Sequence, residues 1–165
     1  DGNLFVSVGD RGNPNNAQDS TNHAGKIMRI TEFGEVPSDN PFVNSTKARK
    51  EIWSMGHRNI QGMDIHPITG ELWAHEHGPQ GGDELNKIIK GANYAWPLAT
   101  FGINYNGTEI TKDTTYPGCL DPITYWKPSI APCGMAFVRD NKKSNESDIL
   151  IGALAGQRLT RLYLK

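Results

Sequence analysis

The apolar residues of this chain fall in short runs, and each run ends at a turn signal. LFVSV precedes a Gly-Asp-Arg-Gly turn, KIMRIT precedes Glu-Phe-Gly, and MDIHP precedes Ile-Thr-Gly, which is followed by ELWAHE. The pattern continues with MAFVRD, DILIGAL and the C-terminal RLTRLYLK. Runs of this length, bounded by Gly, Asn, Asp or Pro, predict β-strands. The sequence therefore predicts an all-β fold.

One segment has a different pattern. Residues 82–89 place two acidic residues, Asp83 and Glu84, ahead of the apolar Leu85 and Ile88. Acidic residues before apolar positions three apart are typical of the first turn of a helix. We therefore expect one short helix over residues 82–89 and strands elsewhere.

The connections between the runs also carry information. Short strands joined by long segments rich in Gly and Pro describe a sandwich, a barrel or a propeller. The N-terminal element Asp-Gly-Asn-Leu-Phe-Val recurs loosely as Thr-Gly-Glu-Leu-Trp-Ala at residues 69–74, and turns that open strands at such intervals are typical of propeller blades. Residues 101–128 show no pattern and are too long for a passive connection, which predicts a functional loop.

Size and charge exclude some classes of function. The 165 residues are consistent with a single domain, residues 1–165. With 17 Lys and Arg against 18 Asp and Glu, the net charge of -1 provides no basic face for nucleic acid or an anionic membrane. No apolar stretch approaches the roughly 20 residues of a membrane span, and the N-terminus does not have the pattern of a signal peptide. We expect neither nucleic acid nor membrane as a partner.

The two cysteines leave two interpretations open. Cys119 and Cys133 would close a loop of about 15 residues, and a bond between them would contribute about 3 kcal/mol. Two separate thiols are equally compatible with the sequence. Neither cysteine lies in a spacing that predicts a zinc site.

A first candidate site is the pair Arg58 and Asn59, which lies between Gly56 and Gly62. A charged fork of donors beside an amide, on a backbone that can turn tightly, suits an anionic ligand rich in oxygen. The alternative is that Arg58 pairs with a structural carboxylate while Asn59 caps a turn.

A second candidate is the acidic segment 76–84, EHGPQGGDE. Its carboxylates and free carbonyls are hard oxygen ligands that favour Ca²⁺ or Mg²⁺. The alternative is that Asp83 and Glu84 simply begin a helix. His75 and His77, two apart, could bind a transition metal, but no third ligand is evident, and a pair of half-exposed strand histidines is the preferred interpretation.

Several motifs together resemble one family. Eight segments, taken in order along the chain, are VSVGDRG, AQDSTNHAGKIMRI, GHRNIQG, EHGPQGGDELN, GANYAWP, FGINYNG, ITYWKPSIAPCGMAF and ILIGALAGQRLTRL. Together they are similar to the soluble aldose sugar dehydrogenases of the glucose/sorbosone dehydrogenase family. The resemblance implies a β-propeller with six blades, of which this chain holds about three. It also implies pyrroloquinoline quinone (PQQ) and Ca²⁺ as cofactors, oxidation of aldose sugars to lactones, and a periplasmic or secreted location.

The resemblance implies two sets of site residues. Those that would contact PQQ, a planar tricarboxylate suited to cationic and amide donors, are Arg58, Asn59 and Tyr105. Those that would bind Ca²⁺ are Gly78 and Pro79, through backbone carbonyls near the cofactor, and Glu84 and Tyr94 in the propeller wall.

The catalytic base of the family has no counterpart in this chain. In the family it is a histidine in an Asn-His segment upstream of the strand that leads to the Gly-Asp-Arg-Gly turn, and this chain begins inside that strand. None of the histidines His23, His57, His66, His75 and His77 occupies that motif upstream of the turn. We therefore assign no catalytic residue and expect the chain alone to show no measurable glucose oxidation with added PQQ.

Two functions remain open. The chain is either a segment of a PQQ-dependent aldose dehydrogenase or a non-catalytic half-propeller that serves as a binding or assembly module. In either case about three blades leave two outer faces uncovered. We expect these faces to be covered in a homodimer of two half-rings or by missing blades from a longer chain.

Overall fold

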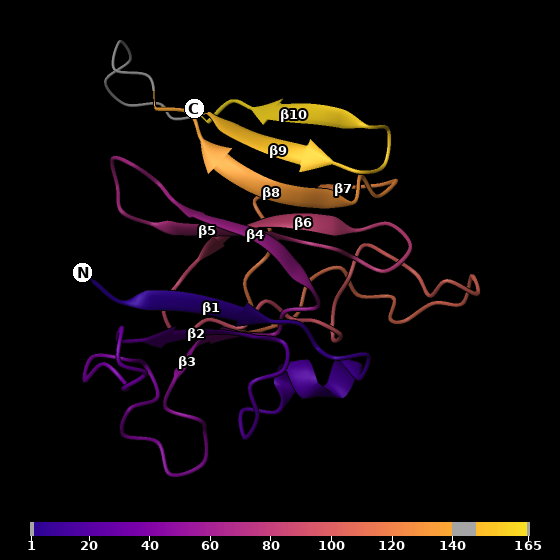
Figure 1. Cartoon of the computed structure of the whole chain (residues 1–165). Coiled ribbons are helices and arrows are strands. Elements are labelled where there is room, and N and C mark those ends of the chain that lie inside the picture. Colours follow the sequence, from indigo (N-terminus) through magenta and orange to yellow (C-terminus); the bar gives the residue numbers. More distant parts are fainter. Residues whose placement is uncertain (1, 140–147, 165) are drawn as a thin grey trace.

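The chain folds into three antiparallel β-sheets (Figure 1). The computed structural model describes residues 2–139 and 148–164. The first sheet contains β1 (Leu4–Val8), β2 (Lys26–Ile30) and β3 (Ile52–Met55); the second β4 (Ile60–Ile65), β5 (Leu72–Glu76), β6 (Asp83–Ile88) and β7 (Thr124–Trp126); the third β8 (Pro132–Phe137), β9 (Ile149–Ala153) and β10 (Arg158–Leu162). A 3-10 helix, η1 (Pro14–Gln18), follows β1.

The sheets are stacked in chain order, with the second sheet between the other two (Figure 1). Two apolar clusters fill the layers between them. The cluster between the first and second sheets consists of Ile27, Ile60, Leu72, Ala74, Ile88 and Tyr94. The cluster between the second and third sheets consists of Trp73, Leu85, Phe137, Ile149 and Ile151. Both faces of the middle sheet are therefore covered, as in consecutive propeller blades.

The predicted all-β fold is confirmed, and all seven apolar runs that were predicted as strands contribute to strands. Two of those runs extend past the described part of the chain, since Asp140 and Lys165 lie outside the described residues. Two short strands, β3 and β7, were not predicted. β7 lies inside the segment 101–128 that was expected to be a loop throughout.

The helix predicted over residues 82–89 is wrong, because the segment forms strand β6. β6 lies between β5 and β7, so its main-chain groups bond to neighbouring strands on both sides. Its two faces are both covered, and the polar Asp83 and Asn86 are buried together with Leu85 and Ile88. A strand buried on both faces loses the alternation of polar and apolar positions by which strands are recognised.

The two cysteines are free thiols, Cys119 half-buried and Cys133 exposed on β8. Of the two interpretations left open by the sequence, the structure therefore supports separate thiols. The cross-link that would have contributed about 3 kcal/mol is absent from this fold.

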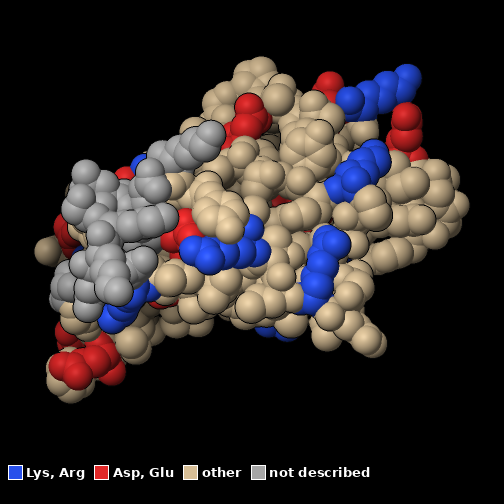
Figure 2. Space-filling model, turned by 90° about the horizontal axis from the view of Figure 1, so that it is seen from above, with Lys and Arg blue, Asp and Glu red and all other residues tan. Residues whose placement is uncertain are grey.

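The surface agrees with the charge balance of the sequence. On the face seen in Figure 2, which looks onto the third sheet, basic and acidic side chains are scattered among uncharged ones without a continuous basic patch. Within residues 2–139 and 148–164, no helix is long and apolar enough to cross a membrane.

Candidate functional site

One end of the stacked sheets carries nearly all of the predicted site residues. β1, β3, β5 and β7 end there, while β2, β4, β6 and β8 begin there. The Arg58–Asn59 turn leads into β4 at this end. The turn passes so close to the next loop that Gly56, with φ of 79°, has no room for a side chain: a Cβ there would lie 2.7 Å from the Tyr94 nitrogen.

Arg58 points its guanidinium away from the core and is not paired with a carboxylate. Its Nη1 donates to the carbonyls of His77 (3.0 Å) and Gly78 (2.7 Å). Its guanidinium carbon lies 5.5 Å from the centre of the Trp96 ring. The turn is fixed from the first sheet as well, because the Arg58 carbonyl accepts from the Asp10 amide at 2.8 Å. Among the described residues, Arg58 therefore forms no ion pair, while Asp10 and Glu109 line the same groove.

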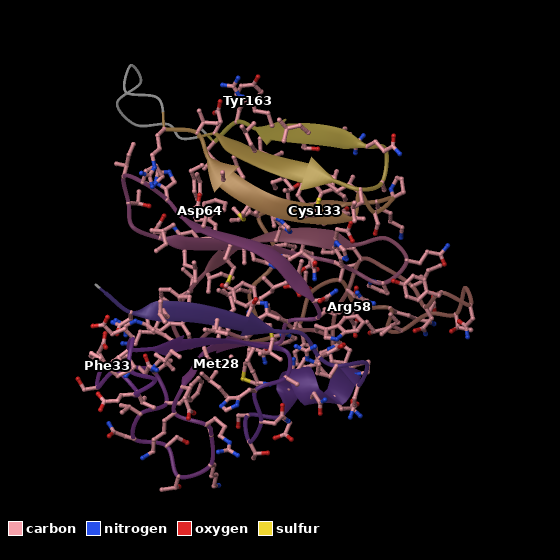
Figure 3. All side chains as sticks on the ribbon, in the orientation of Figure 1. Met28, Phe33, Arg58, Asp64, Cys133 and Tyr163 are labelled. Atoms are coloured by element: carbon pink, nitrogen blue, oxygen red, sulfur yellow. The ribbon has the colours of Figure 1, made fainter. Side chains whose placement is uncertain are left out.

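Two adjoining grooves lie against Arg58. One, of about 350 Å³, is lined by residues that include Pro79, Trp96 and Tyr105. The other, of about 260 Å³, is lined by Arg58, Asn59 and the Gly-Asp-Arg-Gly turn at residues 9–12. In Figure 3, Arg58 lies between the beginning of β4 and the loops of the segment 101–123. The structure thus brings the three residues expected to contact PQQ to one place.

Tyr105 lies in the segment 101–128, which the sequence predicted to be a functional loop. Its side chain is 76% exposed, and it lines the larger groove with Asn104, Glu109 and Ile110 from the same loop. Asn104 closes the loop on itself, because its amide donates to the Thr108 carbonyl and its carbonyl accepts from the Gly107 amide. The loop therefore forms a structured wall of the groove.

The acidic segment 76–84 contains three carboxylates with different environments. Asp83 is buried, and four donors occupy its oxygens: the amide of Gly78 (2.9 Å), the hydroxyl of Ser129 (2.9 Å) and the amides of Ile130 and Ala131 (both 2.8 Å). Asp83 therefore neither begins a helix nor has capacity left for a cation. It fixes the loop before β6 to the loop before β8.

We predict that Asp83→Asn destabilises the fold. An amide offers only one acceptor atom, so at least the Gly78 amide or the paired amides of residues 130–131 would face a nitrogen and lose their partner. A buried donor without a partner costs about 1–3 kcal/mol. Denaturant unfolding should show this loss, while Asp113→Asn, in an exposed loop turn, should change the stability by much less. Equal stabilities of the two variants would contradict the assignment.

Glu76, at the end of β5, is also fully occupied. One carboxylate oxygen accepts from the amides of Arg58 (2.6 Å) and Asn59 (3.4 Å). The other oxygen lies 2.9 Å from His57 Nδ1 and accepts from Asn86 Nδ2 at 3.2 Å. A buried carboxylate is tolerated when its oxygens are hydrogen-bonded, and here each oxygen has two donors.

Glu84 is the carboxylate of this segment with acceptor capacity left. Among the described residues, its carboxylate accepts from Asn86 Nδ2 at 3.3 Å. Burial and, after it, the neighbouring charge of Glu76 raise the pKa of Glu84 to about 8. A carboxyl group that resists ionisation in a polar, enclosed place is one that a cation would stabilise.

A small enclosed cavity adjoins Glu84. Its volume of about 10 Å³ is enough for one water molecule or one ion, and its lining includes Arg58, Gly78, Glu84 and Tyr94. Tyr94 can offer only its main-chain oxygen, because its hydroxyl donates to the Lys87 carbonyl. No group of three or more His, Cys, Asp or Glu residues that could hold a metal occurs in the described part of the chain. A cation here would therefore rely on Glu84 and backbone carbonyls, a donor set that fits Ca²⁺.

The histidines of the segment have structural partners. His75 is fully buried, and its Nε2 lies 3.1 Å from the Gly134 carbonyl. His77 lies one residue beyond the end of β5, with Nε2 at 2.8 Å from the Pro132 carbonyl. The interpretation of a half-exposed pair on one strand is therefore wrong. Both rings bind to β8 and help fix the third sheet to the second.

The fold and the site define a stack of propeller blades with a groove beside Arg58 and a small cavity beside Glu84 at one end. The family model for Glucose / Sorbosone dehydrogenase matches residues 1–165. The chain belongs to this family. It is 47% identical over 156 residues to the aldose sugar dehydrogenase YliI of Escherichia coli. This match covers 93% of this chain and 42% of the relative.

Solved structures agree with this assignment. A crystal structure of a glucose dehydrogenase superposes with a TM-score of 0.92 at 44% identity, covering 99% of this chain and 48% of that protein. The PQQ-bound form of an aldose sugar dehydrogenase from Streptomyces coelicolor superposes with a TM-score of 0.78 at 32% identity, covering 99% of this chain and 42% of that protein. The chain thus spans about half the length of the relatives that it matches, and its sheets are β-propeller blades.

Proposed function

We propose that this chain forms part of a PQQ-dependent dehydrogenase that oxidises aldose sugars to lactones. The observation that carries the proposal is the guanidinium of Arg58, which forms no ion pair with a described residue and is held in a groove beside Asn59 and Tyr105. The relatives support the same reaction class, since one is an aldose sugar dehydrogenase and another was solved with PQQ bound.

The groove fits a planar, polyanionic cofactor in three respects. It contains a guanidinium without a carboxylate partner, and such a group binds carboxylates with strong, directional hydrogen bonds. Its wall includes the flat ring of Trp96. The amide oxygen of Asn59 already accepts from Gln61 Nε2 at 3.0 Å, which turns the amide so that its nitrogen remains as a donor for a ligand.

The residues of the chain would bind and orient the cofactor and stabilise charge on it. PQQ, when bound, supplies the acceptor for the two electrons that leave the sugar. Arg58 would stabilise negative charge on the ligand oxygens, an effect that is strongest for a donor held in place beforehand by bonds to His77 and Gly78. The carbonyls of Gly78 and Pro79 are proposed to contact a Ca²⁺ near the cofactor, and Glu84 with the Tyr94 carbonyl a Ca²⁺ in the cavity.

We propose that the proton acceptor is supplied from outside residues 1–165. His57 and His75 are buried, and the ring nitrogen Nε2 of His77 is bound to the Pro132 carbonyl. His23 follows Asn22 but lies after the Gly-Asp-Arg-Gly turn rather than upstream of it, and His66 follows Ile65. The chain is thus proposed to hold the cofactor rather than to abstract the proton.

We propose that further blades or a second copy of the chain cover the two ends of the stack. Apolar side chains are exposed at both ends: Leu4 and Val6 on β1 are 51% and 39% exposed, and Leu159 on β10 is 67% exposed. The face over the third sheet also has many uncharged side chains (Figure 2). A homodimer and missing blades from a longer chain would both bury these residues. A periplasmic or secreted location is proposed from the family.

The reaction is tested on the protein as its gene encodes it, with any sequence that flanks residues 1–165. With PQQ, millimolar Ca²⁺ and an electron-accepting dye, we expect dye reduction to depend on an aldose and to stop when PQQ is omitted. Residues 1–165 expressed alone should bind PQQ weakly and show no turnover. Binding of PQQ without turnover in the gene-encoded protein would instead favour a non-catalytic binding or assembly module.

A further inference from the structure

A buried chain of three polar side chains lies beneath the Arg58–Asn59 turn. Ser54 Oγ is 2.8 Å from His57 Nε2, and His57 Nδ1 is 2.9 Å from Glu76. The order of groups is that of a nucleophilic triad, but Ser54 and His57 are 0% exposed and Glu76 is 4% exposed. No substrate can reach this serine, so the three residues must act on their surroundings rather than on a ligand.

The second oxygen of Glu76 shows which part of the structure these three side chains hold in place. It accepts from the amides of Arg58 (2.6 Å) and Asn59 (3.4 Å), which come directly before β4 begins. The ladder between β4 and β5 starts only at Ile60, which pairs with Glu76. The side chain of Glu76 therefore holds both amides of the backbone from which the guanidinium and the amide of the groove project, while the carbonyls of Arg58 and Asn59 accept from the amides of Asp10 and His77.

We propose that Glu76 is a positioning residue for the cofactor groove and that His57 orients it. His57 is fixed in turn, because its ring stacks on that of Tyr94 with centres 4.7 Å apart and planes 24° apart. The inference rests on the proposed function, because it assigns Glu76 a role toward the ligand that Arg58 and Asn59 bind. Glu76 itself does not touch that ligand: its effect passes through two main-chain bonds.

Two substitutions separate the reach of Glu76 from its charge. Glu76→Gln keeps the length, and its oxygen can still accept from the amides of Arg58 and Asn59. Its new amide nitrogen can be accommodated, because the neutral ring of His57 has a second tautomer and the Oδ1 atom of Asn86 is without a partner and can accept after a flip. Glu76→Asp keeps the charge but is shorter by one carbon–carbon bond, so it cannot span the turn and His57 together.

If Glu76 positions the turn, Glu76→Asp should weaken PQQ binding more than Glu76→Gln does. PQQ binding is measured in the gene-encoded protein, at fixed Ca²⁺, by quenching of tryptophan fluorescence, since Trp96 lies beside Arg58. Residues that orient a ligand-binding group typically change affinity about 10- to 100-fold when they are lost. We expect Glu76→Asp to raise the Kd for PQQ by about that factor and Glu76→Gln by no more than a few-fold.

The matched controls are Glu71→Gln and Glu71→Asp. Glu71 precedes β5 and forms a partly exposed ion pair with Lys87, away from the groove, so neither change should alter PQQ binding. The order of the Glu76 variants decides the proposal. Weak binding by Glu76→Gln with normal binding by Glu76→Asp would show that charge is what matters, and normal binding by both would remove the role altogether.

A second measurement does not depend on PQQ. Hydrogen exchange of the Arg58 and Asn59 amides reports directly on their bonds to Glu76. We expect faster exchange at these amides in Glu76→Asp than in Glu76→Gln at equal global stability. If the unmodified protein fails to bind PQQ, the proposed function fails, whereas unchanged exchange in Glu76→Asp overturns the positioning role of Glu76 by itself.

Discussion

Arg58→Met is expected to abolish PQQ binding at concentrations that saturate the unmodified protein, and aldose oxidation with it. Methionine matches much of the length of the side chain but removes the charge and all of its donors. The guanidinium is the positive group shared by both grooves and is paired with no described carboxylate. Removing one preorganised donor costs about 10²- to 10³-fold in rate, and losing a charge against a polyanion adds to that. Fluorescence titration and dye-linked turnover measure the two effects.

The matched control is Arg49→Met. Arg49 is exposed and likewise donates to a main-chain carbonyl, that of Thr21 at 2.9 Å, but it lies outside the grooves. Arg58→Lys should fall between the two, because lysine keeps the charge without the fork that bonds two carbonyls at once. If Arg58→Met lowered the melting temperature but still bound PQQ normally, Arg58 would be a structural residue and the proposed site would be wrong.

The local sequence predicted β2 and β5, which are buried on both faces, but predicted a helix where β6 forms. β6 is covered on both faces, and the three-residue spacing of Leu85 and Ile88 then suits a strand as well as a helix. Residues 83–88 form a strand rather than a helix because they pair with β5 and β7. β7 is 36 or more residues further along the chain. Local patterns contain no information on such a partner.

The site was predictable where its residues are adjacent and unpredictable where they meet across strands. Arg58 and Asn59 stand together between glycines, so the motif was visible, and Tyr105 was placed through the family resemblance. The partner of their amides, Glu76, is reached only through the register of β4 on β5, which shifts between Ile60 and Gly62. Sequence reasoning therefore missed Glu76 as the residue that holds the turn.

The acidic segment shows the same limit. Composition indicated hard oxygen ligands but could not say which carboxylates were free. Asp83 is occupied by donors from residues 129–131, 46 to 48 positions away. Glu76 is occupied by the turn before β4. The acceptor capacity that remains on Glu84 is a consequence of these long-range bonds, and only the fold reveals it.

Glu84 should make the stability of the cation-free protein depend on pH. Its pKa is raised from 4.5 to about 8 in the folded state, so folding favours the protonated form. Stability is then highest below the unfolded value and falls as the pH rises from about 4.5 to 8, because unfolding releases the proton across that range. The loss is expected to be on the order of a few kcal/mol. Thermal melts in EDTA at several pH values measure it.

Ca²⁺ should reverse this loss, because it stabilises the ionised carboxylate that burial disfavours. Binding displaces the proton of Glu84, so the rise in melting temperature with millimolar Ca²⁺ should be small near pH 5 and large near pH 8 or above. Glu84→Gln should remove both the pH dependence and the response to Ca²⁺, whereas Glu32→Gln, at an exposed turn position, should leave both intact. Melting that is insensitive to EDTA and to Ca²⁺ at pH 8 would show that the cavity beside Glu84 is filled by water and that the carboxyl group stays protonated.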